Sequence, residues 1–286
     1  MPIDPALAIG ADLGEVRFAW TPSDVLLYHL ALGAGADPVD ERELRYAYEQ
    51  DLRVLPTFAT VAANLRTFEP PALKFPGVDI DLAKVLHGTQ EIEVHRPIPT
   101  NGEAVARTRI ADVFDKGKAA VLVQETTVAH ADGNPLWTAR SSIFARGEGG
   151  FGGERGPSQQ VAFPDREPDA VLNTPTLPQQ ALLYRLCGDL NPLHADPAFA
   201  RAAGFDRPIL HGLCTYGVVA KALADAFLDG DPARIRSFGT KFAGVVFPGE
   251  RLRTRVWRDD GRLLATTTAA DRADAPVLSD TVLVPR

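Results

Sequence analysis

Hydrophobic and polar residues alternate over two long stretches of the chain, and each stretch follows an apolar segment with helical spacing. The alternation predicts strands at residues 91–96, 103–114, 118–130 and 136–145, and again at 237–243, 250–258, 262–269 and 277–284. Helical spacing predicts a long buried helix over about 213–228, and the matching segment 55–65 predicts its counterpart. A buried helix followed by an antiparallel meander is typical of an α+β fold in which a curved sheet wraps around the helix.

The two stretches belong to an internal repeat. The sequence Leu26-Leu27-Tyr28-His29-Leu30 returns as Leu182-Leu183-Tyr184-Arg185-Leu186, and the segment 55–65 returns at 213–223. Glycine-rich residues 147–160 separate the copies and predict a linker. We therefore predict an N-terminal repeat over residues 1–146, a linker over 147–160 and a C-terminal repeat over 161–286, with the two sheets paired edge to edge.

Shorter helices are predicted where a capping residue stands before a proline. Thr21-Pro22 marks one such start and Asp196-Pro197 marks another. Asp37-Pro38 repeats the second pair in the first half of the chain. These positions predict the same element order in both copies.

Charge and cysteine content narrow the class of protein. The 286 residues carry a net charge of −7, which disfavours a protein that coats nucleic acid. Two cysteines in so long a chain indicate a fold without a disulfide framework and a reducing, cytoplasmic compartment. The sequence shows neither a secretory leader nor an apolar run that could span a membrane, so we expect no nucleic-acid or membrane partner.

Chemistry is concentrated between residues 184 and 217, where Asp189 and His194 flank a loop that contains Asn191-Pro192. Because the proline interrupts ordinary helix, the loop can turn both side chains toward one point. A carboxylate and an imidazole at one point can hold and deprotonate a water molecule. In the first copy, Gly33 stands in the place of Asp189 and the loop that follows has no histidine. The sequence therefore predicts one active site, in the second copy.

Gly212 stands directly before the long predicted helix. The N–H groups at a helix N-terminus are unpaired, and a glycine leaves its own N–H open to a developing oxyanion. The neighbouring His211 is expected to be structural, and Asp196 to cap a helix. Cys187 and Cys214 are expected to be small buried groups.

No metal or dinucleotide site is expected. The cysteines and histidines of the 184–217 segment match no zinc spacing. The glycines at 147–152 fit a dinucleotide pattern only by composition, since no helix opens after them.

The segment 184–217 closely resembles hydratase 2, the (R)-specific enoyl-CoA hydratases of the MaoC-like dehydratase family, which include the hydratase domain of peroxisomal multifunctional enzyme type 2. The matching motifs read Tyr-Arg-Leu-x-Gly-Asp-x-Asn-Pro-Leu-His from Tyr184 and Pro-Ile-Leu-His-Gly-Leu-Cys-Thr-Tyr-Gly from Pro208. Further matches at Tyr48-Glu49, His87-Gly88 and 247–250 extend the resemblance over nearly the whole chain. The resemblance implies a double hot-dog fold.

It also implies a reaction. Asp189 and His194 would bind a water molecule, add it to C3 of a trans-2-enoyl-CoA and deliver a proton to C2, which gives the (R)-3-hydroxyacyl-CoA. The N–H of Gly212 would stabilise the enolate oxygen of the thioester. The first copy would have lost its own dyad to leave room for a bulky acyl chain. CoA is part of the substrate, and no cofactor is needed.

The resemblance implies further roles. Asn191, Glu49 and Tyr184 would support the site, while Lys241 and Arg185 are candidates to contact CoA. Relatives often carry a Lys-Pro pair before the Phe247-Pro248-Gly249 motif, and here that pair is absent. We expect an acyl-CoA thioester as the partner molecule and a homodimer as the assembly.

Three alternatives remain open at this point. A dehydratase of (R)-3-hydroxyacyl groups on acyl carrier protein would use the same chemistry on another carrier. A hot-dog acyl-CoA thioesterase would direct the water at the carbonyl carbon. A non-catalytic acyl-CoA-binding module would not need an intact Asp189 and His194.

Overall fold

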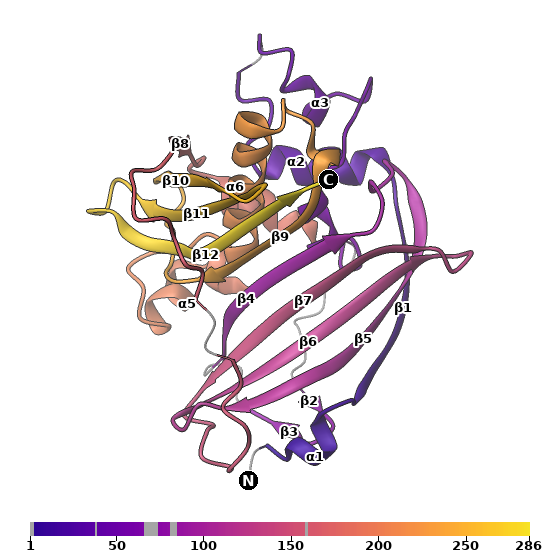
Figure 1. Ribbon diagram of the computed structural model, residues 1–286, viewed down its shortest axis with the longest axis vertical. Coiled ribbons are helices and arrows are strands. Elements are labelled where there is room, and N and C mark those ends of the chain that lie inside the picture. Colours follow the sequence, from indigo (N-terminus) through magenta and orange to yellow (C-terminus); the bar gives the residue numbers. More distant parts are fainter. Residues whose placement is uncertain (1–2, 38, 66–73, 81–84, 158–159) are drawn as a thin grey trace.

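The computed structural model describes residues 3–37, 39–65, 74–80, 85–157 and 160–286. Ten strands of this part of the chain form one antiparallel sheet in the order β1-β5-β6-β7-β4-β9-β12-β11-β10-β8 (Figure 1). The first half supplies β1 (Asp12–Trp20), β4 (Val85–Val94), β5 (Gly102–Asp115), β6 (Ala119–His130) and β7 (Pro135–Arg146). The second half supplies β8 (Ala170–Pro175), β9 (Ile235–Phe242), β10 (Arg251–Asp259), β11 (Arg262–Ala269) and β12 (Ala275–Pro285).

The two halves join edge to edge, as the repeat predicts. Strand β4 pairs antiparallel with β9, from Thr89 opposite Lys241 to Glu93 opposite Ser237. Each predicted strand coincides with an observed one to within a few residues, apart from β4, which begins six residues earlier than predicted. Strands β1 and β8, which were not predicted, are the two outermost strands of the sheet. Their residues are mostly exposed or half-buried, as is typical of strands at the edge of a sheet.

Helix α6 (Gly212–Phe227) is the long buried helix that the sequence predicts, and Figure 1 shows it against the strands of the second half. Helix α2 (Pro22–Ala31) begins at the predicted Thr21, whose backbone N–H donates to Asp24 over 2.8 Å. Helix α5 (Pro197–Ala202) is capped by Asp196, as predicted. Pro38, in the matching pair of the first half, lies outside the described residues. The shorter helices are α1 (Pro5–Ala8), α3 (Leu44–Ala47) and α4 (Gln180–Tyr184).

The first half does not form the long helix predicted over 55–65. Its counterpart is a 3₁₀ helix, η1 (Pro56–Thr60), followed by turns up to Leu65. The Thr60 hydroxyl donates to the carbonyl of Thr57 over 2.8 Å within this compact turn.

One large hydrophobic cluster extends through both halves of the molecule. Tyr28 and Tyr184, which are equivalent in the repeat, meet in it with ring centroids 6.1 Å apart. At Gly217 of α6 a side-chain Cβ would lie 2.7 Å from the side chain of Leu32, so the glycine permits a close approach of α6 to the end of α2. The two copies therefore share a core.

A smaller cluster lies at the far end of the first-half strands, where Figure 1 shows α1 with the hairpin of β2 (Lys74–Phe75) and β3 (Val78–Asp79). Ile3, Val78 and Ile110 belong to it. Cys187 and Cys214 are both free and buried, as expected.

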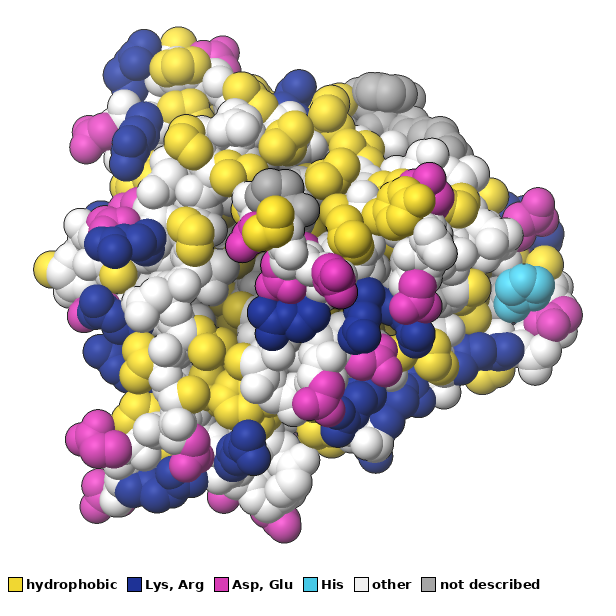
Figure 2. All heavy atoms as spheres, turned by 90° about the horizontal axis from the view of Figure 1, so that it is seen from above, with side chains coloured by type: hydrophobic (Ala, Val, Ile, Leu, Met, Phe, Trp, Pro, Cys, Tyr) yellow, Lys and Arg dark blue, Asp and Glu magenta, His cyan; other side chains and the backbone are white. Residues whose placement is uncertain are grey.

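The face in Figure 2 carries Lys and Arg side chains interleaved with Asp and Glu, and exposed apolar groups lie among them. Among the described residues, no helix combines the length and the apolar character that crossing a bilayer requires.

Candidate active site

The loop that carries Asp189 and His194 is held against the first half of the chain. The 3₁₀ turn Arg185–Cys187 ends at Gly188, whose φ of 108° lies in the left-handed region. A Cβ at Gly188 would overlap the carbonyl oxygen of Asn64. Gly188 therefore lets the loop lie directly on the backbone of the other copy.

Asn191 shapes this loop. Its backbone N–H donates to Oδ1 of Asp189 over 3.2 Å, and its own Oδ1 accepts from the N–H of Leu193 over 3.0 Å. Pro192 then opens a single 3₁₀ turn that ends at His194. These bonds orient the Asp189 carboxylate and the His194 ring from opposite ends of one short loop.

The imidazole of His194 has a defined tautomer. Its Nδ1 lies 2.9 Å from the carbonyl oxygen of Ile209, and because a carbonyl only accepts, Nδ1 carries the proton. Nε2 is then left with a lone pair. Burial lowers the pKa of His194 below its usual value, which favours the neutral ring that a general base needs.

His211 lies directly behind this pair. Its ring stacks on that of His194, with centroids 3.7 Å apart and planes inclined by 29°. Nε2 of His211 donates to the backbone carbonyl of Asp189 over 3.1 Å. Burial first, and the neighbouring His194 second, lower the pKa of His211 to about 3, so its ring is neutral.

Gly212, predicted to stand directly before the long helix, is the first residue of α6, and its N–H has no acceptor within the helix. Position 212 has little room for a side chain, because a Cβ would lie 3.1 Å from the ring of Phe242. That ring also contacts His87 of β4, with centroids 4.6 Å apart. The start of α6 is thus walled by residues from both halves.

Buried polar atoms without a hydrogen-bond partner gather around this loop. They include Nε2 of His87, the hydroxyl of Tyr184, Nε of Arg185 and Nδ1 of His211, each unpartnered within the described chain. The Tyr184 ring lies 4.9 Å from that of His211. Leaving a buried polar group unpaired costs about 1–3 kcal/mol. Their concentration here indicates a place where substrate or water completes the bonding.

The structure does not bring every predicted residue to this loop. Glu49 is exposed in a bend after α3, and no described contact joins it to Asp189 or His194. Lys241 is exposed on β9. Because successive side chains of a strand face opposite sides, Lys241 lies on the other face of the sheet from Phe242, which covers Gly212. Arg185 and Tyr184, in contrast, are adjacent to the site.

Sequence reasoning assigned no function to His87 or Phe242. A signal for His87 is present, since the His-Gly dipeptide of 87–88 recurs at 211–212. Phe242 follows the candidate Lys241 by one residue. Choosing between the two required knowing which face of β9 is turned toward α6.

Asp189, His194 and His211 each offer one possible metal-ligand atom, and these atoms lie within 4.8 Å of one another. Nδ1 of His194 and Nε2 of His211 already face backbone carbonyls, which leaves one further nitrogen on each ring.

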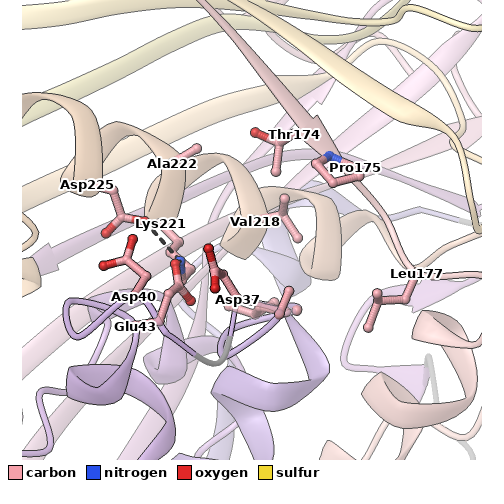
Figure 3. Close-up of a pocket in the computed structure, with 13 residues that line it drawn as sticks. Asp37, Asp40, Glu43, Thr174, Pro175, Leu177, Val218, Lys221, Ala222 and Asp225 are labelled. Carbon is pink, nitrogen blue, oxygen red and sulfur yellow. Dashed lines mark hydrogen bonds and ion pairs between the residues drawn. The ribbon is translucent and has the colours of Figure 1, made fainter.

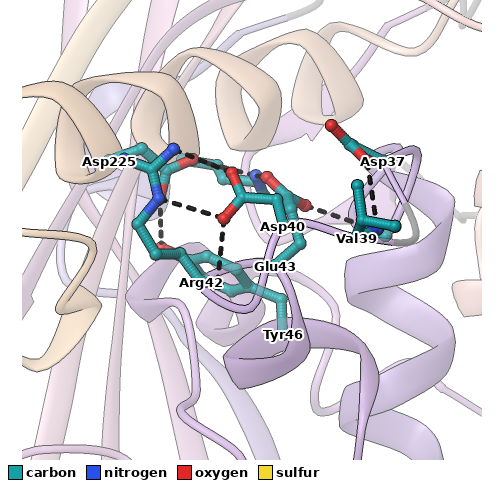
Figure 4. Close-up of polar contacts among 9 residues, drawn as sticks. Asp37, Val39, Asp40, Arg42, Glu43, Tyr46 and Asp225 are labelled. Carbon is teal, nitrogen blue, oxygen red and sulfur yellow. Dashed lines mark hydrogen bonds and ion pairs between the residues drawn. The ribbon is translucent and has the colours of Figure 1, made fainter.

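A cavity of about 280 Å³ lies elsewhere, between α6, the end of β8 and the segment that follows α2 (Figure 3). Lys221 lies at its edge, with Nζ 2.6 Å from Glu43 and 2.9 Å from Asp225. Tyr46 donates its hydroxyl to Asp225 over 2.9 Å, and Figure 4 shows this network together with the neighbouring Asp40. Asp189, His194 and Gly212 do not line this cavity. We interpret these ion pairs and the hydrogen bond as contacts that hold the two halves together.

The chain is similar to known proteins over nearly its whole length. Residues 18–147 match the MFE-2 hydratase 2 N-terminal domain, and residues 159–275 match the MaoC like domain. The chain is 56% identical over 285 residues to enoyl-CoA hydratase ChsH3 of Mycobacterium tuberculosis, with 100% of both chains covered. It is 41% identical over 282 residues to the peroxisomal enoyl-CoA hydratase 2 of Arabidopsis thaliana, covering 93% of this chain and 91% of that one. The crystal structure of a MaoC-like dehydratase from Phytophthora capsici superposes with a TM-score of 0.90 at 30% identity, covering 99% of this chain and 98% of that chain.

Proposed function

Because this chain belongs to the MaoC-like dehydratase family and has the MFE-2 hydratase 2 N-terminal domain in its first half, we propose that it catalyses the (R)-specific hydration of trans-2-enoyl-CoA. It is a hydro-lyase, and the reverse reaction dehydrates (R)-3-hydroxyacyl-CoA. The observation that carries the proposal is the convergence of the Asp189 carboxylate and the neutral His194 ring next to the start of α6.

In the proposed mechanism, a water molecule binds between the Asp189 carboxylate and Nε2 of His194. Its oxygen forms the bond to C3 while the dyad accepts one of its protons. The electrons of the double bond move to the thioester as an enolate, whose oxygen is stabilised by the N–H of Gly212. The dyad then delivers a proton to C2. Both H and OH of the water molecule are added to the substrate and no electron is transferred to an acceptor, so the proposed reaction needs no cofactor.

We propose that the acyl chain extends toward the first half of the molecule. Support comes from the compact turn that replaces a long helix over 55–65, and from the absence of a second dyad there. Arg185 is proposed to contact CoA, because its Nε is buried without a partner beside the site. A contact with Lys241 would require the CoA moiety of the substrate to reach the other face of the sheet, so we do not propose Lys241 as a CoA ligand.

The cellular setting is also proposed. The two free, buried cysteines support a reducing compartment, which we propose is the cytoplasm. A homodimer is proposed because leucines on the adjacent helices α2 and α4 remain exposed, Leu30 at 44% and Leu182 at 54%. Light scattering on the purified protein tests the dimer.

The function is tested with crotonyl-CoA and trans-2-decenoyl-CoA, by following the loss of enoyl-thioester absorbance and resolving the product enantiomers. We expect (R)-3-hydroxyacyl-CoA from at least one of them. Release of free thiol without hydration would identify a thioesterase instead. Turnover only of the substrate on acyl carrier protein would identify the dehydratase of that carrier.

A further inference from the structure

His211 contacts both members of the proposed dyad, and the mechanism above gives it no role. Its side chain is 1% exposed. Nε2 donates to the backbone carbonyl of Asp189 over 3.1 Å, and the ring stacks on His194 at 3.7 Å. On its other side it meets the buried ring of Tyr184. One imidazole therefore links the protein core to both water-binding groups.

The choice of histidine at this position has a cost. Nδ1 of His211 is buried with no partner in the described chain, and an unpaired buried acceptor is unfavourable. A phenylalanine would fill the space and stack on His194 without that cost. What phenylalanine lacks is the N–H that holds the Asp189 carbonyl. A neutral imidazole can both stack on His194 and donate to this carbonyl.

The internal repeat separates the needs of the fold from those of the site. In the first copy, the position equivalent to His211 is Arg53. The Arg53 side chain is 44% exposed and pairs with Asp51 on the surface. The first copy, in which η1 takes the place of the long helix, has no buried ring at this position. The ring is present only in the copy that carries Asp189 and His194.

We propose that His211 is a positioning residue that holds the Asp189 main chain and the His194 ring at the separation at which one water molecule touches both. The inference rests on the proposed hydratase function. The neutral state of His211 also favours the reaction, because a cation stacked on His194 would oppose the proton that His194 gains.

Two variants separate the contacts of His211. His211→Phe keeps a ring but removes the donor to Asp189, and His211→Gln keeps an N–H donor but removes the ring. We expect kcat for trans-2-decenoyl-CoA to fall at least about tenfold in His211→Phe and less in His211→Gln, with KM changed less than about threefold. His29→Gln is the matched control, since it alters another buried histidine outside the site and should leave kcat unchanged.

A second measurement does not depend on turnover. Hydrogen–deuterium exchange of the loop 188–194 reports whether its amides, among them Asn191 and Leu193, lose protection. We expect faster exchange in His211→Phe than in the wild-type protein. The proposal is overturned if this exchange is unchanged, or if it rises while kcat stays at the wild-type value. If the wild-type protein hydrates no enoyl-CoA, the proposed function is refuted. Faster exchange in His211→Phe would then still show that His211 holds the loop 188–194.

Discussion

At the scale of the residue, the same helix position in the two copies serves different ends. His29 and Arg185 are equivalent in the repeat. His29 is a core residue whose Nδ1 donates to the Tyr46 carbonyl over 2.9 Å and whose Nε2 accepts from the N–H of Leu55 over 3.1 Å. Arg185 instead borders the site with an unpartnered Nε. Duplication has thus left a structural side chain in one copy and a candidate ligand contact in the other.

The neutral state of His194 predicts the pH dependence of the reaction. Burial lowers its pKa, and a general base works unprotonated, so activity is present above that pKa and lost as the pH falls through it. We expect kcat/KM to persist below pH 6.5, where an exposed histidine would already be protonated, and then to fall about tenfold per pH unit. An acid limb centred at or above pH 6.5 in the measured profile would contradict this role for His194.

His29 predicts a pH dependence of stability. Burial lowers its pKa from 6.5 to about 4 in the folded protein, so between these values the unfolded chain binds the proton more strongly. The stabilising contribution is therefore complete above pH 6.5 and decreases as the pH falls toward 4, by about 3 kcal/mol in all. Unfolding by urea at several pH values should show a shallower dependence in His29→Gln. Equal slopes in variant and wild type would refute the assignment.

Site residues could be predicted where their placement depends on neighbouring residues in the sequence. The Asn191-Pro192 turn and the helix start at Gly212 suffice to place Asp189, His194 and Gly212 as candidates. Glu49 and Lys241 depend on tertiary structure, because neither a bend after α3 nor the face of a strand is specified by nearby residues. The same limit explains why Phe242 was missed.

At the scale of the element, α6 combines two tasks. Its first turn carries Gly212, and Lys221, further along the helix, is 12% exposed and pairs with Glu43 of the first half. The apolar spacing of 213–228 is enough to predict this helix. Its counterpart over 55–65 has similar spacing but forms η1, so the spacing by itself does not specify a long helix.

Lys221 provides a test of this connection. Lys221→Met should lower the free energy of unfolding by about 1–3 kcal/mol, since the carboxylates of Glu43 and Asp225 then lose their shared ammonium. The exposed Lys241→Met is the matched control and should change stability little. Urea unfolding of both variants measures the difference. Equal stabilities would show that the network does not hold the halves together.

At the scale of the whole molecule, the two halves share one sheet and one main hydrophobic cluster. The sheet is continuous through β4 and β9, and the main hydrophobic cluster draws residues from both copies. The edge-to-edge pairing could be predicted from the repeat, because two equivalent open sheets have matching edges. The outermost strands β1 and β8 were not predicted, although Phe18 and Trp20 of β1 and Leu172 of β8 pack in or against the main cluster.

A shared core predicts a single unfolding transition. Where unfolding is reversible, differential scanning calorimetry should show one transition with equal calorimetric and van't Hoff enthalpies. Two resolved transitions, one for each repeat, would mean that the halves fold independently.

We propose that Asp189 and His194 together activate one water molecule, and the kcat of Asp189→Asn with trans-2-decenoyl-CoA tests this proposal. This substitution keeps the size of the side chain and an oxygen that can accept from the N–H of Asn191, so the loop should stay folded. We predict that kcat falls by about 10²–10⁴-fold while the melting temperature remains near that of the wild-type protein. A folded Asp189→Asn variant with near wild-type kcat would show that Asp189 does not activate the water molecule.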